Sequence, residues 1–512
     1  MIKKRILSIA AAMIMIFAAV IGFGGMSAKA EETTAKPFDM YLIGGQSNAV
    51  GYSLASKGDV SGTFSNVMYA GEVDKRLDGA GSMSNLYSYA TYKKAVTVGC
   101  GVRNGYLGPE FGMAKTLNSY YSGEKKAIMF KSAAGGTSLL DKSSGQSETY
   151  GNWYPRSKWK DGFTPDASVS PTGVQYKNFI DNFRQVYNTL KNNGYEPKVK
   201  GMVWMQGEDD LGAKNVYKPL LKALISDLRE DIAEITCDRD NEIMPFVIGE
   251  IATTFVIYDN PNVPGFNRMQ REVAAEMPGV YTAKTDDLII MGADGVQGTD
   301  PYHFSGSDMV TLGERFAEKL MLADNETLVS MNVYGKNGDA FYKLSDDKSK
   351  VTITMKPDKN YKVSSVIVNG MEFVDKLQNN ELTVDADGEK RFAVKVKFVK
   401  KTALTVKVEC GEGGRAEADV TFEGDKIIVA VKPDAGYKVK SVSIGGVELA
   451  LNAETGKYES EPVTTGGIVK VEFERENAAD NGNSGCGGKN AAIAIGFAIA
   501  VAAIALKRGG TF

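Results

Sequence analysis

The stretch MYLIGGQSNAVGYS (residues 40–53) joins a short apolar run to a loop of glycine, amide and serine residues. The apolar run has the length of a buried strand, and the glycines and polar residues after it predict a tight turn at its carboxyl end. Ser47 lies in this turn, either as a polar turn residue or as a nucleophile. The rest of the sequence has to decide between these two interpretations.

Apolar runs of strand length alternate with amphipathic segments over the first 325 residues. This alternation predicts a parallel sheet covered by helices on both faces, a three-layer α/β/α domain over residues 31–325. Ligands of such sheets bind beyond the carboxyl ends of the strands, where Ser47 lies. The strand-like runs are 40–43, 127–130, 201–205 and 246–251, and apolar residues recur at helical spacing over 176–190 and 220–232.

From residue 327 the pattern changes to alternating β-branched residues with Pro-Asp, Asn-Gly and Gly-Gly turns. VTITMKPDKNYKVSSVIVNGMEF (351–373) returns as IIVAVKPDAGYKVKSVSIGGVEL (427–449), with a period of 76 residues. The repeat predicts two small all-β modules, 327–399 and 402–475. A spacer role is favoured for them, and sugar binding is the alternative, because such a fold does not itself imply a function.

The N-terminal end of the chain predicts export. Lys3, Lys4 and Arg5 precede an apolar stretch, and Ala28-Lys29-Ala30 has the form of a cleavage site, so residues 1–30 read as a secretory signal peptide. The alternative is an uncleaved anchor.

A polar, Gly-rich linker (476–490) leads to an apolar segment that ends in Lys507 and Arg508. As a helix, its sixteen apolar or small residues would span about 24 Å, which is shorter than the roughly 30 Å of a bilayer core. Flanking basic side chains that reach the membrane interface can make up the difference. Residues 491–508 are therefore expected to be a transmembrane or sorting segment that tethers the exported protein to the outer face of a bacterial membrane. A small docking helix is the alternative.

Composition excludes several classes of function. The formal net charge is −3, and it becomes −7 when the four cations of residues 1–30 are removed, so no general attraction to nucleic acid is expected. The four cysteines show no metal-binding spacing. His303 is the single histidine, which excludes histidine-rich metal catalysis but allows one imidazole base. No metal or cofactor is expected.

His303 lies in GTDPYHFSG (298–306), three residues after Asp300. In a turn, this spacing lets the carboxylate reach the imidazole ring and fix its tautomer, as a catalytic triad requires. Ser305 is expected to cap the helix that follows. A base and its acidic partner would then lie on one loop opposite Ser47, which favours the nucleophile interpretation.

Two further strand ends offer donors for a developing oxyanion. VWMQGEDD (203–210) places Gln206, a neutral amide donor, directly after a buried strand, and SAAGGTSL (132–139) offers the backbone N–H groups of Gly135 and Gly136. The alternatives are a plain turn for the glycines and a hydrogen-bonded loop scaffold for Glu208 and Asp210.

The motifs GQSN, GGTS, WxQGExD and DxxHF, in this order, resemble those of the SGNH-type carbohydrate esterases, and more narrowly the sialate O-acetylesterase and acetylxylan esterase group (carbohydrate esterase family 6-like). GPEFGMAKTL (108–117) is also similar to this group. The resemblance covers residues 38–323. It implies Ser47 as nucleophile, His303 as base and Asp300 as its partner. The implied oxyanion hole consists of the Ser47 N–H, the N–H of Gly135 or Gly136, and the Gln206 side chain.

The resemblance further implies supporting roles around this site, with Glu208 as an alternative partner of His303. Two departures from the family pattern, Ala49 after GQSN and Met205 before QGE, concern the shape of the pocket more than the chemistry. The supporting residues are Gln46, Asn48, Glu208 and Asp210.

The implied activity is two-step removal of O-acetyl groups from carbohydrates, either O-acetylated sialic acids or acetylxylan. Trp153 or Trp159 of YGNWYPRSKW (150–159) is a candidate for stacking on sugar rings, with an anchored surface loop as the alternative. A catalytically weak glycan-binding adhesin and an esterase for another ester are the competing functions.

Overall fold

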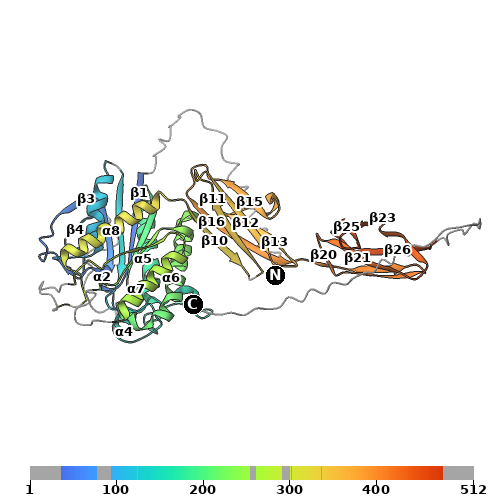
Figure 1. The fold of residues 1–512 in the computed structure, drawn as a ribbon. Helices are drawn as coiled ribbons and strands as arrows, with labels where there is room; N and C mark the ends of the chain where they lie inside the picture. Colours follow the sequence, from blue (N-terminus) through green and yellow to red (C-terminus); the bar gives the residue numbers. More distant parts are fainter. Residues whose placement is uncertain are drawn as a thin grey trace, which may run out of the picture. The chain divides into compact units, whose positions relative to one another are not determined.

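The computed structural model describes residues 36–77, 94–123, 125–253, 261–290, 300, 302–335 and 337–476. Its chain divides into two compact units, residues 1–399 and 400–512 (Figure 1). The predicted signal peptide and C-terminal segment, and the linker after residue 476, lie outside the described residues. Within the described ranges, no helix is long and apolar enough to span a membrane.

The first unit is built on a seven-stranded sheet that confirms the predicted parallel α/β architecture. Its strands run parallel except for β4, which pairs antiparallel with β3 at one edge. The four predicted strands are β1, β6, β7 and β8. Across the sheet the order is β4 (Lys94–Thr97), β3 (Thr63–Val73), β6 (Lys126–Ala133), β1 (Lys36–Gly45), β7 (Tyr195–Met205), β8 (Phe246–Gly249) and β9 (Val280–Ala283).

Helices cover both faces of this sheet (Figure 1). On β7, Gly201 lies against Leu320 of α8, whereas the next residue, Met202, lies on the same side as Phe179 of α5. Successive residues of a strand point to opposite faces, so α5 and α8 lie on opposite sides. The longer helices are α3 (Pro109–Leu117), α5 (Val174–Asn192), α6 (Lys214–Thr236), α7 (Asn262–Glu276) and α8 (Gly306–Asp324).

Helix α8 follows the His303 loop directly, so its position fixes that of the loop. Ser305 caps it as predicted, by accepting a hydrogen bond from the Asp308 N–H at 3.1 Å. Helix α3 crosses α8 at a pair of glycines, and a Cβ added at Gly112 would lie 2.0 Å from the Val310 carbonyl oxygen. Only glycine allows this close approach of the two helices.

Between α8 and residue 476, the described secondary structure consists of β-strands and one short 3-10 turn. The predicted repeat is confirmed, because β13 begins at Tyr361 and β22 at Tyr437, the aligned tyrosines. Module 1 contains β10 (Leu328–Tyr334), β11 (Gly338–Leu344), β12 (Lys350–Pro357), β13 (Tyr361–Val368), β14 (Met371–Glu372), β15 (Glu381–Asp385) and β16 (Arg391–Lys400), with the 3-10 turn η6 (Val374–Lys376). Module 2 contains β17 (Ala403–Leu404), β18 (Val406–Cys410), β19 (Gly414–Ala418), β20 (Thr421–Phe422), β21 (Lys426–Pro433), β22 (Tyr437–Ile444), β23 (Val447–Glu448), β24 (Ala450–Asn452), β25 (Lys457–Pro462) and β26 (Gly467–Arg475).

Each module pairs its strands into two main sheets with a small apolar core. In module 1 the sheets are β10-β16-β13-β14 and β11-β12-β15. In module 2 they are β18-β26-β22-β23 and β19-β21-β25-β24.

Candidate active site

The ends of three neighbouring strands bring the sequence motifs together. Gly45, the last residue of β1, pairs with Ala133 at the end of β6 on one side and with Met205 at the end of β7 on the other. Because these strands are parallel, GQSN, GGTS and QGED all follow the same edge of the sheet. Gly45 has φ +137°, and a Cβ there would lie 2.1 Å from the Met205 carbonyl oxygen, so glycine is required where the strands end.

Ser47 begins the short helix α2 (Ser47–Val50) and is 8% exposed. Gly51 ends the helix with φ +99°, close against the backbone of Leu107 and Gly108. Among the described residues, the Ser47 hydroxyl has no hydrogen-bond partner. It is a partly accessible hydroxyl at the carboxyl end of a central strand, as a nucleophile requires.

Asp300 and His303 form the predicted pair. Asp300 Oδ2 lies 2.8 Å from His303 Nδ1, and Oδ1 accepts the N–H groups of Tyr302 at 2.9 Å and His303 at 3.2 Å. Burial raises the pKa of Asp300, but the hydrogen bond and charge of His303 and these N–H groups outweigh it, so the pKa lies below its ordinary value. An ionised Asp300 favours the proton on Nδ1 and leaves Nε2 as the basic atom.

Asn48 connects the serine turn to the histidine loop. Its Nδ2 group donates to the Tyr302 carbonyl oxygen at 3.0 Å and to Glu208 Oε1 at 2.8 Å. The residue after Ser47 therefore bonds the residue before His303. Burial raises the pKa of Glu208, while the hydrogen bond from Asn48 and the charge of His303 oppose this rise. His303 thus pairs with Asp300, and Glu208 holds Asn48.

Gln206 has a different role from the predicted one. Its Nε2 group donates to the Thr137 carbonyl oxygen at 3.0 Å and to Asp210 Oδ2 at 2.8 Å, and its Oε1 accepts from the Tyr217 hydroxyl at 2.7 Å. Both amide hydrogens are in use and the residue is fully buried. The structure therefore leaves Gln206 no hydrogen for an oxyanion. It makes Gln206 and Asp210 parts of a hydrogen-bonded scaffold, the alternative considered for Asp210.

The two glycines after β6 also differ from each other. The Gly135 N–H donates to Asp74 Oδ1 at 2.8 Å, so it is not free to bind an oxyanion. Gly136 has φ +64°, and within the described part of the chain its N–H has no hydrogen-bond partner. The N–H groups of Ser47 and Gly136 are thus the remaining oxyanion donors of the predicted set.

The two tryptophans differ in burial. Trp153 is 0% exposed and donates from Nε1 to Thr137 Oγ1 at 3.0 Å, so the stacking role predicted for it is wrong. Trp159 packs edge-on against Phe163 and Tyr176. These contacts agree with the alternative, an anchored loop, for Trp153, whereas sugar stacking by the partly exposed Trp159 stays a prediction.

Tyr52 and Asp74 belong to the site and were missed from sequence. The Tyr52 ring stacks on His303, with centroids 4.8 Å apart and planes 15° apart, and its hydroxyl donates to Asp74 Oδ2 at 2.6 Å. Asp74 thus holds both Tyr52 and Gly135. Burial raises the pKa of Asp74, although these two hydrogen bonds oppose the rise. Tyr52 lies five residues after Ser47 in the stretch 40–53, and this closeness in sequence could have marked it as a residue of the site.

A buried ion pair contacts the end of α2, the short helix that begins at Ser47. Lys131 of β6 and Glu110 of α3 are fully buried, with Nζ 2.7 Å from Oε2. Lys131 also donates to the carbonyl oxygen of Val50, the last residue of α2, at 2.7 Å, and Glu110 Oε1 accepts from the Gly108 N–H at 2.8 Å. The pair therefore links β6 and α3 to the end of the Ser47 helix.

The three-layer parallel sheet, the serine at a strand end and the Asp–His pair on a neighbouring loop are the parts expected of an esterase of the α/β fold class. The model of a carbohydrate esterase family, described as sialic acid-specific acetylesterase, matches residues 37–322. The chain belongs to this family and is a carbohydrate O-acetylesterase.

Solved structures that a structural comparison matches to this chain include NanS, a protein from Arabidopsis thaliana and a carbohydrate acetylesterase from Xanthomonas citri. NanS is 14% identical with TM-score 0.38, covering 56% of this chain and 98% of NanS. The Arabidopsis protein is 13% identical with TM-score 0.34, covering 56% of this chain and 98% of its own. The Xanthomonas enzyme is 14% identical with TM-score 0.35, covering 69% and 74%. No curated protein matches the sequence.

Proposed function

We propose that this chain is an exported esterase that deacetylates O-acetylated sialic acids through Ser47, His303 and Asp300. The observation that supports it most is the Asp300–His303 pair at 2.8 Å, on a loop that Asn48 bonds directly beside Ser47. The family's description names sialic acid. Acetylxylan is the second candidate substrate.

In the proposed reaction, the Ser47 oxygen attacks the acetyl carbonyl carbon while His303 Nε2 takes the hydroxyl proton. The N–H groups of Ser47 and Gly136 stabilise the oxyanion. The bond to the sugar oxygen then breaks, and His303 returns the proton to that oxygen, which leaves acetyl-Ser47. Water attacks this ester with His303 as base, and acetate and free Ser47 result. Ionised Asp300 stabilises the imidazolium at both steps.

Acetate release from O-acetylated sialoglycans and from acetylxylan tests this proposal. Residues 31–475 should release acetate from at least one of these substrates, and Ser47→Ala and His303→Ala should each lower kcat about 10⁴-fold or more. Release by the parent no faster than by Ser47→Ala on every substrate would overturn the proposal and favour a glycan-binding protein. Activity of His303→Ala near that of the parent would remove the assigned base.

Export and tethering rest on residues 1–30 and 491–508 of the sequence. In bacterial expression the full chain should fractionate with membranes and be accessible from outside the cell. Deletion of residues 491–512 should release it into the medium. Membrane association that persists after the deletion would refute the tether.

A further inference from the structure

The two β-modules differ at one sheet edge. The period of 76 residues aligns β15 with β25 and the 3-10 turn η6 with β24. In module 2, β24 pairs antiparallel with β25, as Ala450 with Glu459 and Asn452 with Lys457. In module 1 the aligned segment is coiled as η6, and its only bridge to β15 is that of Gln378 with Glu381. Among the described residues, β15 is therefore the open edge of the sheet β11-β12-β15.

The pairing register shows which backbone groups this edge presents. The Met355 N–H donates to Asn380 and the Ala386 N–H donates to Ser349, so the even-numbered residues from 380 to 386 bond β12. The N–H and C=O groups of Thr383 and Asp385 point the other way, and no hydrogen bond to another described residue occupies them. In module 2 the residue aligned with Thr383, Glu459, pairs with β24.

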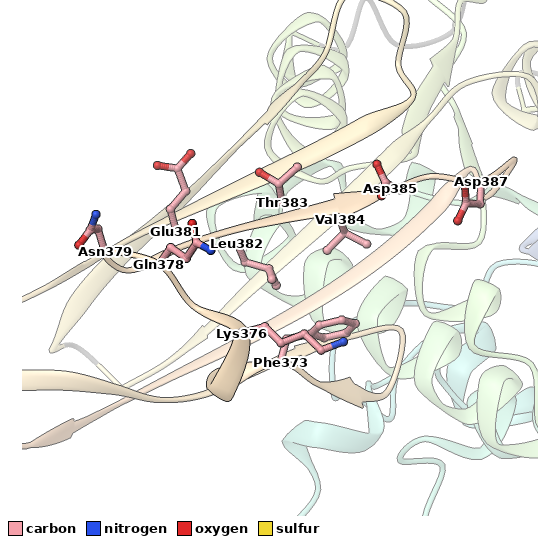
Figure 2. A pocket seen from close by; sticks show the side chains of 10 residues that line it. All are labelled: Phe373, Lys376, Gln378, Asn379, Glu381, Leu382, Thr383, Val384, Asp385 and Asp387. Atoms are coloured by element: carbon pink, nitrogen blue, oxygen red, sulfur yellow. The ribbon is translucent and has the colours of Figure 1, made fainter.

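A groove of about 660 Å³ lies along this edge (Figure 2). Leu382 and Val384 point to the side of the strand where Phe373 lies, and they form an apolar floor. Glu381 and Asp385 lie on the opposite face of β15. With Asp387, these carboxylates outnumber the one cation of the lining, Lys376.

We propose that this groove binds an extended peptide segment of a partner protein, which adds to β15 as a strand in the place that β24 takes in module 2. Side chains of the added strand would alternate, with apolar residues over Leu382 and Val384 and basic residues beside Glu381 and Asp385. An oligosaccharide fits less well, because the one aromatic ring of the groove, Phe373, has Lys376 Nζ over it at 5.0 Å. The proposal does not depend on the esterase activity.

Fluorescence anisotropy of two labelled peptides with the full chain tests this. VELALNA reproduces residues 447–453, and VKLKLNA carries lysines at the positions that would face Asp385 and Thr383, on the face of β15 that also carries Glu381. VKLKLNA should bind saturably and more tightly than VELALNA, and its affinity should fall with salt. Thr383→Pro removes an N–H that faces the groove without removing a hydrogen bond to β12, and it should weaken binding at least tenfold, whereas Thr383→Val should not.

A thermal melt would reveal whether Thr383→Pro fails to fold. In that case the control is a VKLKLNA peptide that is N-methylated at the backbone N–H groups facing β15. It should bind the unmodified protein at least tenfold more weakly. Absence of saturable binding by both peptides, or equal binding of the methylated and unmethylated forms, would overturn the proposal. Displacement of VKLKLNA by xylo- or sialo-oligosaccharides would overturn it in favour of a sugar site.

Discussion

The ring of Tyr52 positions His303 by stacking on it, while Asp74 holds the Tyr52 hydroxyl. Tyr52→Ala removes both contacts and should lower kcat about 10–100-fold with little change in KM, because a base displaced by ~1 Å transfers protons poorly. Tyr52→Phe keeps the stacked ring and should lose less than about tenfold. Steady-state kinetics on an acetyl ester measure both. Equal losses in the two variants would show that the hydroxyl, rather than the stacked ring, positions the base.

The lowered pKa of Asp300 predicts how its contribution to stability depends on pH. A carboxyl group whose pKa is lower in the folded state stabilises the fold above its unfolded pKa, about 3.9, and this contribution is lost as pH falls through the folded value. The difference in unfolding free energy between the parent and Asp300→Asn should therefore be largest above about pH 4 and shrink below it. Urea titrations between pH 3 and 7 measure it. A difference that grows on acidification would contradict the assignment.

The sequence predicted the contact between Asp300 and His303, but not which of the candidate oxyanion donors are already hydrogen-bonded. This pair is encoded locally, by the single histidine of the chain and an aspartate three residues before it. Whether a donor is free depends on distant partners. The Gly135 N–H is taken by Asp74, 61 residues away, and Gln206 is held by Thr137, Asp210 and Tyr217. Local spacing carries no information on such contacts.

Three elements meet at the buried pair of Lys131 and Glu110, which therefore belongs to the scale of strands and helices. Removal of one partner leaves an uncompensated buried charge, so Lys131→Met or Glu110→Gln should destabilise the fold by about 3–5 kcal/mol. The double replacement Lys131→Met with Glu110→Leu should cost less than the two single changes added. Chemical denaturation measures all of these free energies. Additive losses would mean that the two charges do not depend on each other.

Strands that form continuous apolar runs were predicted, and strands of mixed composition were not. β1, β6, β7 and β8 each contain a buried segment at the centre of the sheet, and in each this segment includes an apolar run. β3 lies next to the edge strand, its first half is largely exposed, and its sequence TFSNVMYAGEV carries no such signal. The sequence therefore did not predict that Asp74, the residue after β3, belongs to the site.

At the scale of the whole chain, the change of pattern near residue 327 predicts a boundary, but the first compact unit continues to Val399. Arg391 of β16 explains this, since it is 7% exposed and donates to the carbonyl oxygens of Glu326 at 2.8 Å and Ala323 at 3.1 Å. Leu328 and Ala393 of module 1 also form a small buried cluster with Ile243 of the esterase domain. An arginine in a β-strand sequence gives no sign of such contacts.

Module 1 should therefore stabilise the esterase domain. A chain of residues 31–325 loses the contacts of Arg391, Leu328 and Ala393, worth about 2–4 kcal/mol, and should melt roughly 5–10 °C below residues 31–399. Arg391→Ala in residues 31–399 should reproduce part of this loss, because it leaves the Ala323 and Glu326 carbonyl groups without their donor. Both truncated forms keep Ser47, Asp300 and His303, so their rates of acetate release at 25 °C should agree within about threefold. Thermal unfolding followed by circular dichroism distinguishes the alternatives: equal melting temperatures for the two chains would mean that module 1 only follows the esterase domain in sequence and contributes nothing to its stability.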